Sequence, residues 1–424
     1  MSLLSPNYPT THGVLYKLAI LIFVCILVLH GTYIRTRPGV QVPTMDWLVA
    51  ARLLACAIAF IVGIILIPKN VSWGFGAKSL LVYLLAAGIS AIKSPYPVTV
   101  VGYFILLLGA SVLMIALTYS ARNVLQLERI EKIWFLTVTI LVIKDAITSL
   151  MFPEMEGTTT RGTFRLGMGV THAVALSFLA GLVFWLSLKE ARPTHPIMVW
   201  PIRFFCIFVI LLARSRVPIA SFLFAGCCFF LFKRNDLKRW VIVPACIGLL
   251  VTFLILNLSF GSPWADETVK YLKRGQGITG LKTFTSRTYI WGHVLNKSMD
   301  SPIVGHGFGV SRLTMGNPPG VSFQPDHCHN EALEVFFDMG LFGLIPFFAM
   351  FMYSLRWIKD SSRLRRVFST DMALHGICVV AMLLASSMFE IRVAARVTPI
   401  QPLFFLYLLT LDRERHFLQL RKNV

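Results

Sequence analysis

Long apolar runs recur along the whole chain, and they constrain its fold more than any other feature of the sequence. Each run is bounded by charged residues, proline or glycine, and most approach the roughly 20 apolar residues that one helical membrane crossing requires. Hydrophobic residues make up 56% of the 424 residues and charged residues only 14%, whereas a soluble domain carries about 25% charged residues. This pattern excludes an ordinary soluble enzyme and predicts an all-α polytopic membrane protein.

We expect about twelve transmembrane helices that form a single integral membrane domain over residues 1–424. The connections between the apolar runs are short, except for one large loop at 261–340 between the ninth and tenth spans. The predicted spans are 14–33, 47–67, 77–92, 99–119, 133–151, 167–188, 197–213, 217–233, 240–260, 341–358, 372–389 and 398–412.

The distribution of basic residues predicts the orientation in the membrane. The formal net charge is +20, and clusters such as Lys233-Arg234 and Arg365-Arg366 flank the apolar runs. Cytoplasmic loops carry an excess of Lys and Arg, and the bias here places both termini in the cytoplasm. The large loop then faces the periplasm if the host is Gram-negative. No RNA- or DNA-binding motif accompanies the basic clusters, so they indicate contact with membrane lipids and not with nucleic acid.

Several arginines lie in loops on the predicted outer side, where the positive-inside rule disfavours them. One interpretation is that they anchor the chain to headgroups. The other is an outward-facing anion site, because guanidinium groups bind phosphate bidentately and stay charged at any relevant pH. The arginines are Arg161 and Arg165, Arg214 and Arg216, Arg392 and Arg396, and Arg287 in the large loop.

The segment Arg214-Ser215-Arg216-Val217-Pro218 favours the anion site. It lies where one predicted span ends and the next begins, and Ser215 and Pro218 are typical of the start of a helix. The N-terminus of that helix, with its free N–H groups and positive dipole end, would face the outer side with two arginines beside it. Such an arrangement suits a phosphate group.

The large loop contains four of the ten histidines, and one of them lies at a predicted helix start. We expect short helices near 264–270 and 286–295, and a turn at Gly305-His306-Gly307-Phe308-Gly309, because glycines at this spacing do not favour a helix. The run from Asn330 to Asp338 has helical apolar spacing and could be capped by Asp326 or by Asn330.

His329 therefore lies in or just before the first turn of this helix. The helix dipole disfavours a protonated histidine there, and a neutral imidazole can act as a general base near pH 7. Two alternatives stay open, a structural loop histidine and a metal site formed with His327 and Cys328. No complete ligand set at zinc spacing is visible, and the cysteines show no CxxC pattern, so we expect no metal.

These residues resemble the motifs of a known family. His329-Asn330, nine residues and then Gly340-Leu341-Phe342-Gly343 resemble the H-N-x9-G-x-x-G signature of bacterial O-antigen ligases. Three further elements occur in the order of the O-antigen ligase and polymerase superfamily, and together they cover about 205–350. These elements are Ser215-Arg216 at the start of a span, Arg287 with Ile290-Trp291, and Pro302 followed by Gly305-His306-Gly307.

The resemblance implies a metal-independent, inverting glycosyltransferase of the GT-C class in the bacterial inner membrane, with its active site facing the periplasm. The donor would be an O-antigen glycan on undecaprenyl diphosphate, and the acceptor a sugar hydroxyl of lipid A–core oligosaccharide, in lipopolysaccharide biosynthesis. By position, His329 corresponds to the catalytic base, and the donor diphosphate is expected at Arg216 and Arg287. Arg214 and Arg161 match more loosely, and His327, Asn330 and Arg165 are candidates for supporting roles.

Three other functions compete with this one. A polysaccharide polymerase of the same superfamily would use a second lipid-linked glycan as its acceptor, and a protein O-oligosaccharyltransferase would use a protein hydroxyl. A transporter of lipid-linked glycans is the alternative from another class. Transporters often carry internal repeats and interrupted helices near the membrane midplane. The two halves of this chain show no such repeat, which favours an enzyme.

Overall fold

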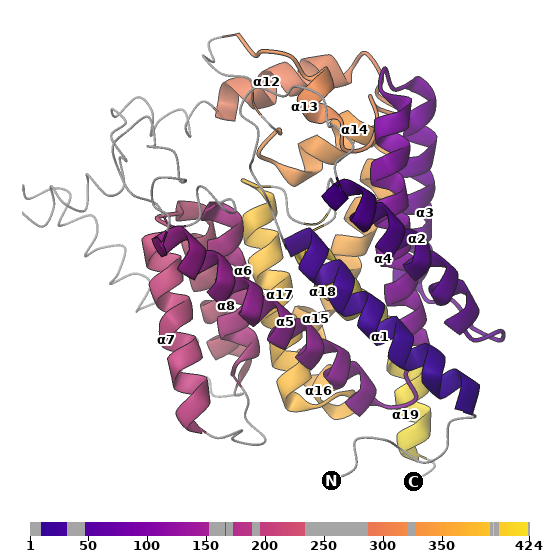
Figure 1. Ribbon diagram of the computed structural model, residues 1–424, viewed down its shortest axis with the longest axis vertical. Coiled ribbons are helices and arrows are strands. Elements are labelled where there is room, and N and C mark those ends of the chain that lie inside the picture. Colours follow the sequence, from indigo (N-terminus) through magenta and orange to yellow (C-terminus); the bar gives the residue numbers. More distant parts are fainter. Residues whose placement is uncertain are drawn as a thin grey trace, which may run out of the picture.

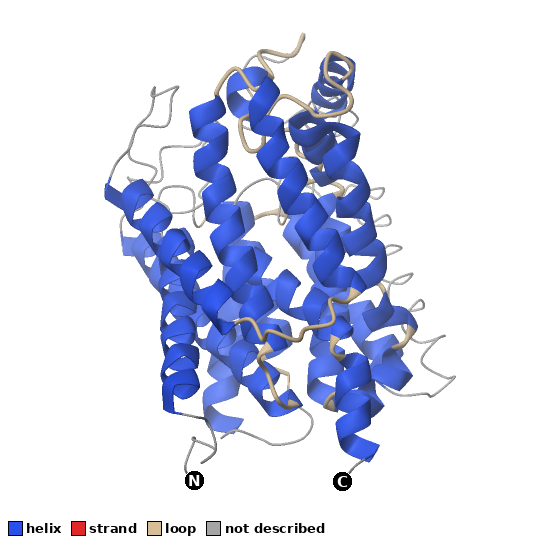
Figure 2. Ribbon diagram, turned by 90° about the vertical axis from the view of Figure 1, so that its right-hand side faces the viewer, coloured by secondary structure: helices blue, strands red, loops and turns tan. Residues whose placement is uncertain are grey.

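The computed structural model consists of helices joined by loops, and its described residues contain no strand (Figures 1 and 2). The described residues are 10–31, 47–151, 166, 173–188, 196–233, 287–319, 325, 327–390, 393 and 398–422.

The described part of residues 1–233 contains eight α-helices and one short 3-10 helix. These are α1 (Thr10–Gly31), α2 (Trp47–Leu66), α3 (Phe75–Ile89), η1 (Ser90–Lys93), α4 (Pro97–Tyr119), α5 (Val124–Met151), α6 (Ala173–Leu186), α7 (Pro196–Leu212) and α8 (Arg216–Lys233).

The second half combines short helices with further long apolar ones. These are α12 (Arg287–Ser298), α13 (Ser311–Thr314), α14 (Glu331–Ser354), α15 (Arg356–Lys359), α16 (Ser361–Val367), α17 (Thr370–Ser387), α18 (Ile400–Asp412) and α19 (Glu414–Lys422).

Seven helices in the described part of the chain are long and apolar enough to cross a membrane, and four shorter apolar helices accompany them. The polytopic all-α class is therefore confirmed. The predicted count of twelve spans stays a prediction, because it includes the shorter helices and the run 240–260, which lies outside the described residues. The short helix expected near 264–270 also lies outside them.

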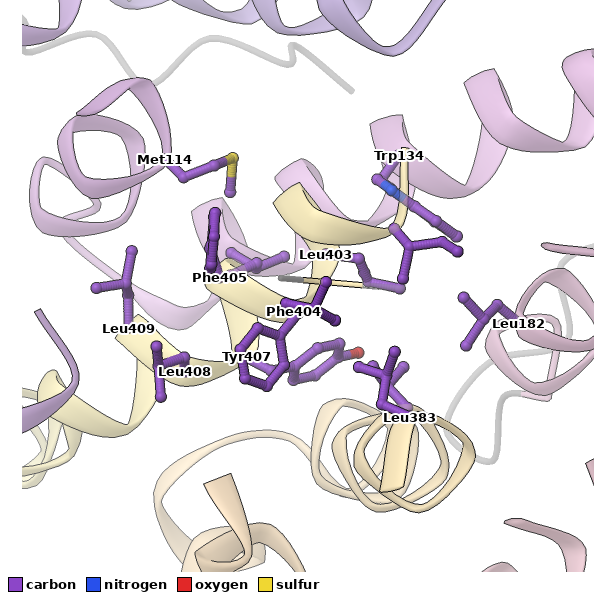
Figure 3. Close-up of a cluster of buried hydrophobic side chains, with 14 of the residues drawn as sticks. Met114, Trp134, Leu182, Leu383, Leu403, Phe404, Phe405, Tyr407, Leu408 and Leu409 are labelled. Atoms are coloured by element: carbon purple, nitrogen blue, oxygen red, sulfur yellow. The ribbon is translucent and has the colours of Figure 1, made fainter. Parts of the chain in front are cut away.

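Helix α18 forms the centre of the core (Figure 3). Its residues from Ile400 to Leu411 are all buried, and a helix that is apolar on every side belongs inside a bundle. Figure 3 shows Phe404 and Phe405 of this helix among side chains from α4, α5, α6 and α17. In Figure 1, α6, α7 and α8 lie on one side of α17 and α18, and α2, α3 and α4 lie on the other.

Two polar contacts fix the ends of this core. The carboxylate of Asp412, at the end of α18, accepts hydrogen bonds from Gly76 N at 2.9 Å and Ala77 N at 2.8 Å. It thereby satisfies the free N–H groups of the first turn of α3. At the other end of α18, Trp134 Nε1 of α5 donates to Pro399 O at 2.6 Å.

Helix α5 begins nine residues before the predicted span 133–151, at Val124. Its first turns carry charged side chains, so an apolar pattern does not predict that they belong to this helix. Glu131 is nevertheless buried, because it contacts His375 of α17 through Oε1 and the imidazole Nδ1. A partner on a distant helix thus allows a charged segment to be part of the core.

Helix α14 contains a sharp break at Gly340, where φ is 60° and ψ is −159°. The bend lets the backbone N–H groups of Leu341 and Phe342 donate to the carbonyls of Pro302 at 2.8 Å and Ile303 at 3.1 Å. Residues before Gly340 belong to the candidate site, and residues after it form the apolar part of α14. The break thus closely follows the run from Asn330 to Asp338, for which the sequence predicts a helix.

The short helices divide between the two ends of the bundle. Helices α12 and α13 lie at one end, and α15, α16 and α19 lie at the opposite end (Figure 1). Arg356 and Arg363 at the latter end form ion pairs with Glu414, at 2.6 Å and 2.7 Å. The parts of the large loop that the structure describes, 287–319 and 327–340, therefore gather at one end of the molecule.

Candidate functional site

The site is built around the start of α14. Asn330 is the N-cap residue of this helix, with extended backbone angles and a side-chain Oδ1 that accepts from Leu333 N at 3.0 Å. This resolves the choice between the two predicted caps in favour of Asn330, and Asp326 lies outside the described residues. His329 precedes the cap and has a φ of 52°, which is uncommon for a residue with a Cβ. The sharp turn at His329 is held by the capped helix that follows.

Three buried carboxylates on α14 hold the loops around this turn. Glu334 accepts from Cys328 N at 2.7 Å and also contacts the hydroxyl of Ser311. Glu331 accepts from the hydroxyl of Ser387 at 2.6 Å, and so ties α14 to the end of α17. Each carboxylate is thus occupied by hydrogen bonds, which satisfy charges that burial would otherwise penalise.

The third carboxylate, Asp338, holds the glycine loop Gly305–Gly309. Its Oδ2 accepts from Gly309 N at 2.8 Å, and its main-chain carbonyl accepts from Gly307 N at 2.9 Å. The three glycines have φ values of 74°, 120° and 76°, so the predicted turn is confirmed. Because a Cβ on Gly307 would lie 2.4 Å from Ser94 Oγ, this loop packs tightly against the residue that follows η1.

Helix α12 brings Arg287 to the site. Its buried residues Ile290 and Val294 pack with Cys328 and Phe337 in a small separate core. Trp291 Nε1 donates to Cys328 O at 3.0 Å, which ties α12 to the segment that carries the two histidines. Arg287 lies in the first turn of this anchored helix, and the predicted helix at 286–295 is confirmed.

Three charged or titratable side chains meet at Glu390, which follows α17. Arg287 Nη2 forms an ion pair with Glu390 Oε1 at 2.7 Å. His329 Nδ1 lies 3.5 Å from Oε1, and His327 Nε2 lies 3.4 Å from Oε2. The Glu390 side chain is only 4% exposed, whereas the two imidazoles are 20–22% exposed. A buried carboxylate thus connects an arginine to two histidines that solvent can reach.

The surroundings of His329 favour its neutral form. Burial lowers the pKa of His329, and the neighbouring His327 lowers it further, while Glu390 acts in the opposite direction and Arg287 again lowers it. The net result is a pKa below the ordinary value, so the imidazole is neutral near pH 7. It can therefore accept a proton, as the sequence analysis expected.

The other predicted site residues lie at the start of α8 or outside the described residues. Arg214 has a φ of 46° and precedes α8, and Arg216 is the first residue of α8. This helix packs along α17, whose C-terminal end leads to Glu390 (Figure 1). Arg161 and Arg165 lie outside the described residues. The structure thus brings together Arg287, His327 and His329, with Asn330 capping the helix beside them.

Sequence reasoning missed Glu390. The acidic residues nearest the His329 motif in sequence are Asp326, Glu331 and Glu334, and the structure shows the last two holding loops. The sequence feature that could have identified Glu390 as a site residue is its position. It is an acidic residue directly after an apolar span, and it lies next to the arginine-containing segment 392–396. Its partner Arg287 is 103 residues away in sequence, so no local pattern connects them.

Comparison with known proteins supports the resemblance. Residues 201–348 match the family model described as O-antigen ligase, so the resemblance found in the motifs is confirmed over this segment. A protein of Rickettsia conorii (strain ATCC VR-613 / Malish 7) named "Putative polysaccharide ligase" is 24% identical over 211 residues, which are 47% of this chain and 48% of that protein. A protein of Rickettsia felis (strain ATCC VR-1525 / URRWXCal2) with the same name is 21% identical over 210 residues, 48% of this chain and 49% of that protein. The chain thus spans about half the length of the curated relatives it matches.

Proposed function

We propose that this protein is an O-antigen ligase that transfers a glycan from undecaprenyl diphosphate to a sugar hydroxyl of lipid A–core oligosaccharide. The observation that carries the proposal is the meeting of Arg287 and His329 on one carboxylate oxygen of Glu390. An anion-binding group and a proton acceptor then lie side by side. The match of residues 201–348 to the O-antigen ligase family supports the same reaction.

His329 is the proposed general base. Its Nδ1 faces Glu390 at 3.5 Å, so a proton on Nδ1 would point at the carboxylate and leave Nε2 to accept another. The acceptor hydroxyl gives its proton to Nε2 while its oxygen attacks the anomeric carbon of the donor. Glu390 stabilises the imidazolium that forms, as a carboxylate behind a catalytic histidine does in other enzymes. Attack opposite the leaving group inverts the anomeric centre.

Arg287 and Arg216 are proposed to bind the leaving diphosphate. The bond between the anomeric carbon and the diphosphate oxygen breaks as the glycosidic bond forms, and negative charge develops on that oxygen. Guanidinium groups positioned there stabilise the charge, the role that a divalent ion has in many other transferases. We therefore propose that transfer needs no metal. Arg214, Arg161 and Arg165 are proposed to extend the same positive surface.

The acceptor distinguishes this function from its rivals. Purified protein would receive lipid-linked glycan with either rough lipopolysaccharide or additional lipid-linked glycan, in buffer with EDTA, and the products would be separated on a gel. A ligase attaches glycan to lipid A–core and does not lengthen the lipid-linked glycans. Longer lipid-linked chains would instead identify a polymerase. Transport of lipid-linked glycan across vesicles without any transfer product would identify a transporter.

We further propose that the active site faces the periplasm of the bacterial inner membrane, with both termini in the cytoplasm. The site lies at the end of the bundle with α12 and α13, opposite α15, α16 and α19 (Figure 1). Basic side chains such as Arg363, Arg365 and Arg366 gather in α16 at that opposite end, as expected for a cytoplasmic face. Labelling of single cysteines at Tyr289 and Arg363 in intact cells would test this, because only the outer position should react.

A further inference from the structure

The two histidines and the glutamate of the site are also arranged as a group of possible metal ligands. His327, His329 and Glu390 each offer one ligand atom, and these three atoms all lie within 4.8 Å of one another. Two imidazoles and one carboxylate form a donor set that zinc accepts, with a water molecule in the fourth position. The imidazole rings lie close together, with centroids 4.1 Å apart.

The spacing of these atoms is compatible with a shared metal ion. His327 Nε2 makes a long hydrogen bond of 3.4 Å with Glu390 Oε2, and His329 Nδ1 lies 3.5 Å from Oε1, both longer than the usual length of about 2.7–3.2 Å for an N–H···O bond. Ligand atoms at the corners of a tetrahedron around zinc are roughly 3.3–3.5 Å apart, given Zn–N and Zn–O bonds of about 2.0–2.2 Å. The contact of His327 Nε2 with Oε2 has the length of one edge of such a tetrahedron, and His329 Nδ1 completes a group of ligand atoms that all lie within 4.8 Å of one another.

The surroundings permit entry of the ion but weaken its binding. The two imidazole rings are partly exposed, and a cation would pass between them to reach the buried Nδ1 of His329. Arg287 opposes the cation, because its guanidinium group already occupies Glu390 Oε1 at 2.7 Å. Oε2 contacts His327 Nε2 at 3.4 Å, so the metal would bind between these two groups while Arg287 keeps Oε1. The positive charge of Arg287 lowers the affinity for zinc without removing a ligand.

We propose that His327, His329 and Glu390 form a zinc-binding site and that occupation of this site by Zn²⁺ inhibits the protein. A neutral imidazole has one lone pair. When Nδ1 of His329 gives this pair to zinc, Nε2 carries the proton and can no longer accept one from the acceptor hydroxyl. The zinc-binding part stands on the ligand geometry alone, and the inhibition rests on the proposed function.

Binding is tested first, on full-length purified protein without a histidine tag. Equilibrium dialysis against Zn²⁺ should show one tightly bound Zn²⁺ ion per chain. His327→Ala and Glu390→Gln should each weaken the binding of that ion by at least about 10–100-fold, because even the loss of a hydrogen-bond partner behind a metal ligand costs that much and each variant removes a direct ligand. Arg287→Gln should bind zinc more tightly than the wild type, because the competing positive charge of the guanidinium group is removed. His293→Ala is the matched control, because His293 lies in the same loop but contacts Met315 O at 2.9 Å, and it should bind zinc as the wild type does.

Unchanged zinc binding in both His327→Ala and Glu390→Gln would overturn the site, and so would an equal loss in His293→Ala. Gel filtration shows whether each variant is folded, and the gain expected in Arg287→Gln cannot come from misfolding. In the second arm, transfer should fall over the same zinc concentrations as binding rises and return on adding EDTA. Activation by zinc would overturn the inhibition. If no transfer occurs under any condition, the proposed function fails while the binding result still decides the zinc site.

Discussion

Arg287 and Glu390 form an ion pair of 2.7 Å between the first turn of α12 and the segment after α17. This pair determines how the site can work, because the arginine expected to bind the donor is already neutralised by a carboxylate. An incoming diphosphate must share Arg287 with Glu390 or displace the carboxylate toward the histidines. Either event changes the charge next to His329. If the protein has the proposed function, donor binding and the strength of the base are therefore coupled through Glu390.

We expect Glu390→Gln to reduce transfer at least tenfold. The amide keeps the shape of the side chain but cannot stabilise an imidazolium at His329, and the loss of an orienting carboxylate behind a catalytic histidine can reach about 10⁴-fold. Glu390→Asp keeps the charge and should recover part of the activity. Initial rates with lipid-linked donor and rough lipopolysaccharide measure the effect.

Glu414→Gln is the matched control for this prediction. Glu414 is also a buried glutamate that pairs with arginines, Arg356 and Arg363, but at the opposite end of the bundle. A comparable loss of rate in the Glu414 variant, at equal amounts of folded protein, would show that removing any buried ion pair impairs the protein. The specific role of Glu390 would then be wrong.

We expect His329→Ala to lower transfer by about 10²–10⁴-fold, the usual effect of losing a general base, with normal protein level and membrane insertion. His293→Ala removes another imidazole of the large loop and should keep most of the activity. Membrane vesicles with matched amounts of each variant, assayed for glycan attached to lipid A–core, provide the measurement. More than about a tenth of wild-type turnover in His329→Ala would exclude the assignment.

The sequence predicted those parts of the structure that depend on local patterns. Apolar runs located most of the long helices, the three glycines predicted the turn at Gly305–Gly309, and Asn330 was one of two predicted caps. Contacts between distant segments were not predictable in this way. Glu131 is buried because His375 of another helix pairs with it, and Glu390 belongs to the site because of Arg287. An apolar pattern carries no information about such partners, so the charged start of α5 and the carboxylate of the site were both missed.

We expect Gly340→Ala to destabilise the fold by about 1–3 kcal/mol, the usual cost of a residue held in a strained backbone region. Its φ of 60° disfavours a side chain, and a Cβ there would lie 2.3 Å from the carbonyl carbon of Ile303. Gly102→Ala in α4 is the control, because nothing lies within 4 Å of its Cβ position, and alanine is favoured there by about 1 kcal/mol. Thermal unfolding in detergent should shift down for Gly340→Ala and not for Gly102→Ala, and equal shifts would exclude a special role for the break in α14.

We expect Arg287→Lys to reduce turnover by about tenfold or more, although the charge is kept. The lysine ammonium is a point charge without the planar fork that binds two oxygens at once, so it cannot hold Glu390 and a phosphate oxygen in the same arrangement. Because charge develops on the leaving diphosphate in the transition state, the loss should appear in kcat as well as in donor binding.

Arg363→Lys is the matched control, since Arg363 is also paired with a glutamate but lies at the opposite end of the bundle. Initial rates against donor concentration for both variants provide the measurement. Near-wild-type kcat in Arg287→Lys would mean that a positive charge alone suffices at this position, and the bidentate role of Arg287 would be abandoned.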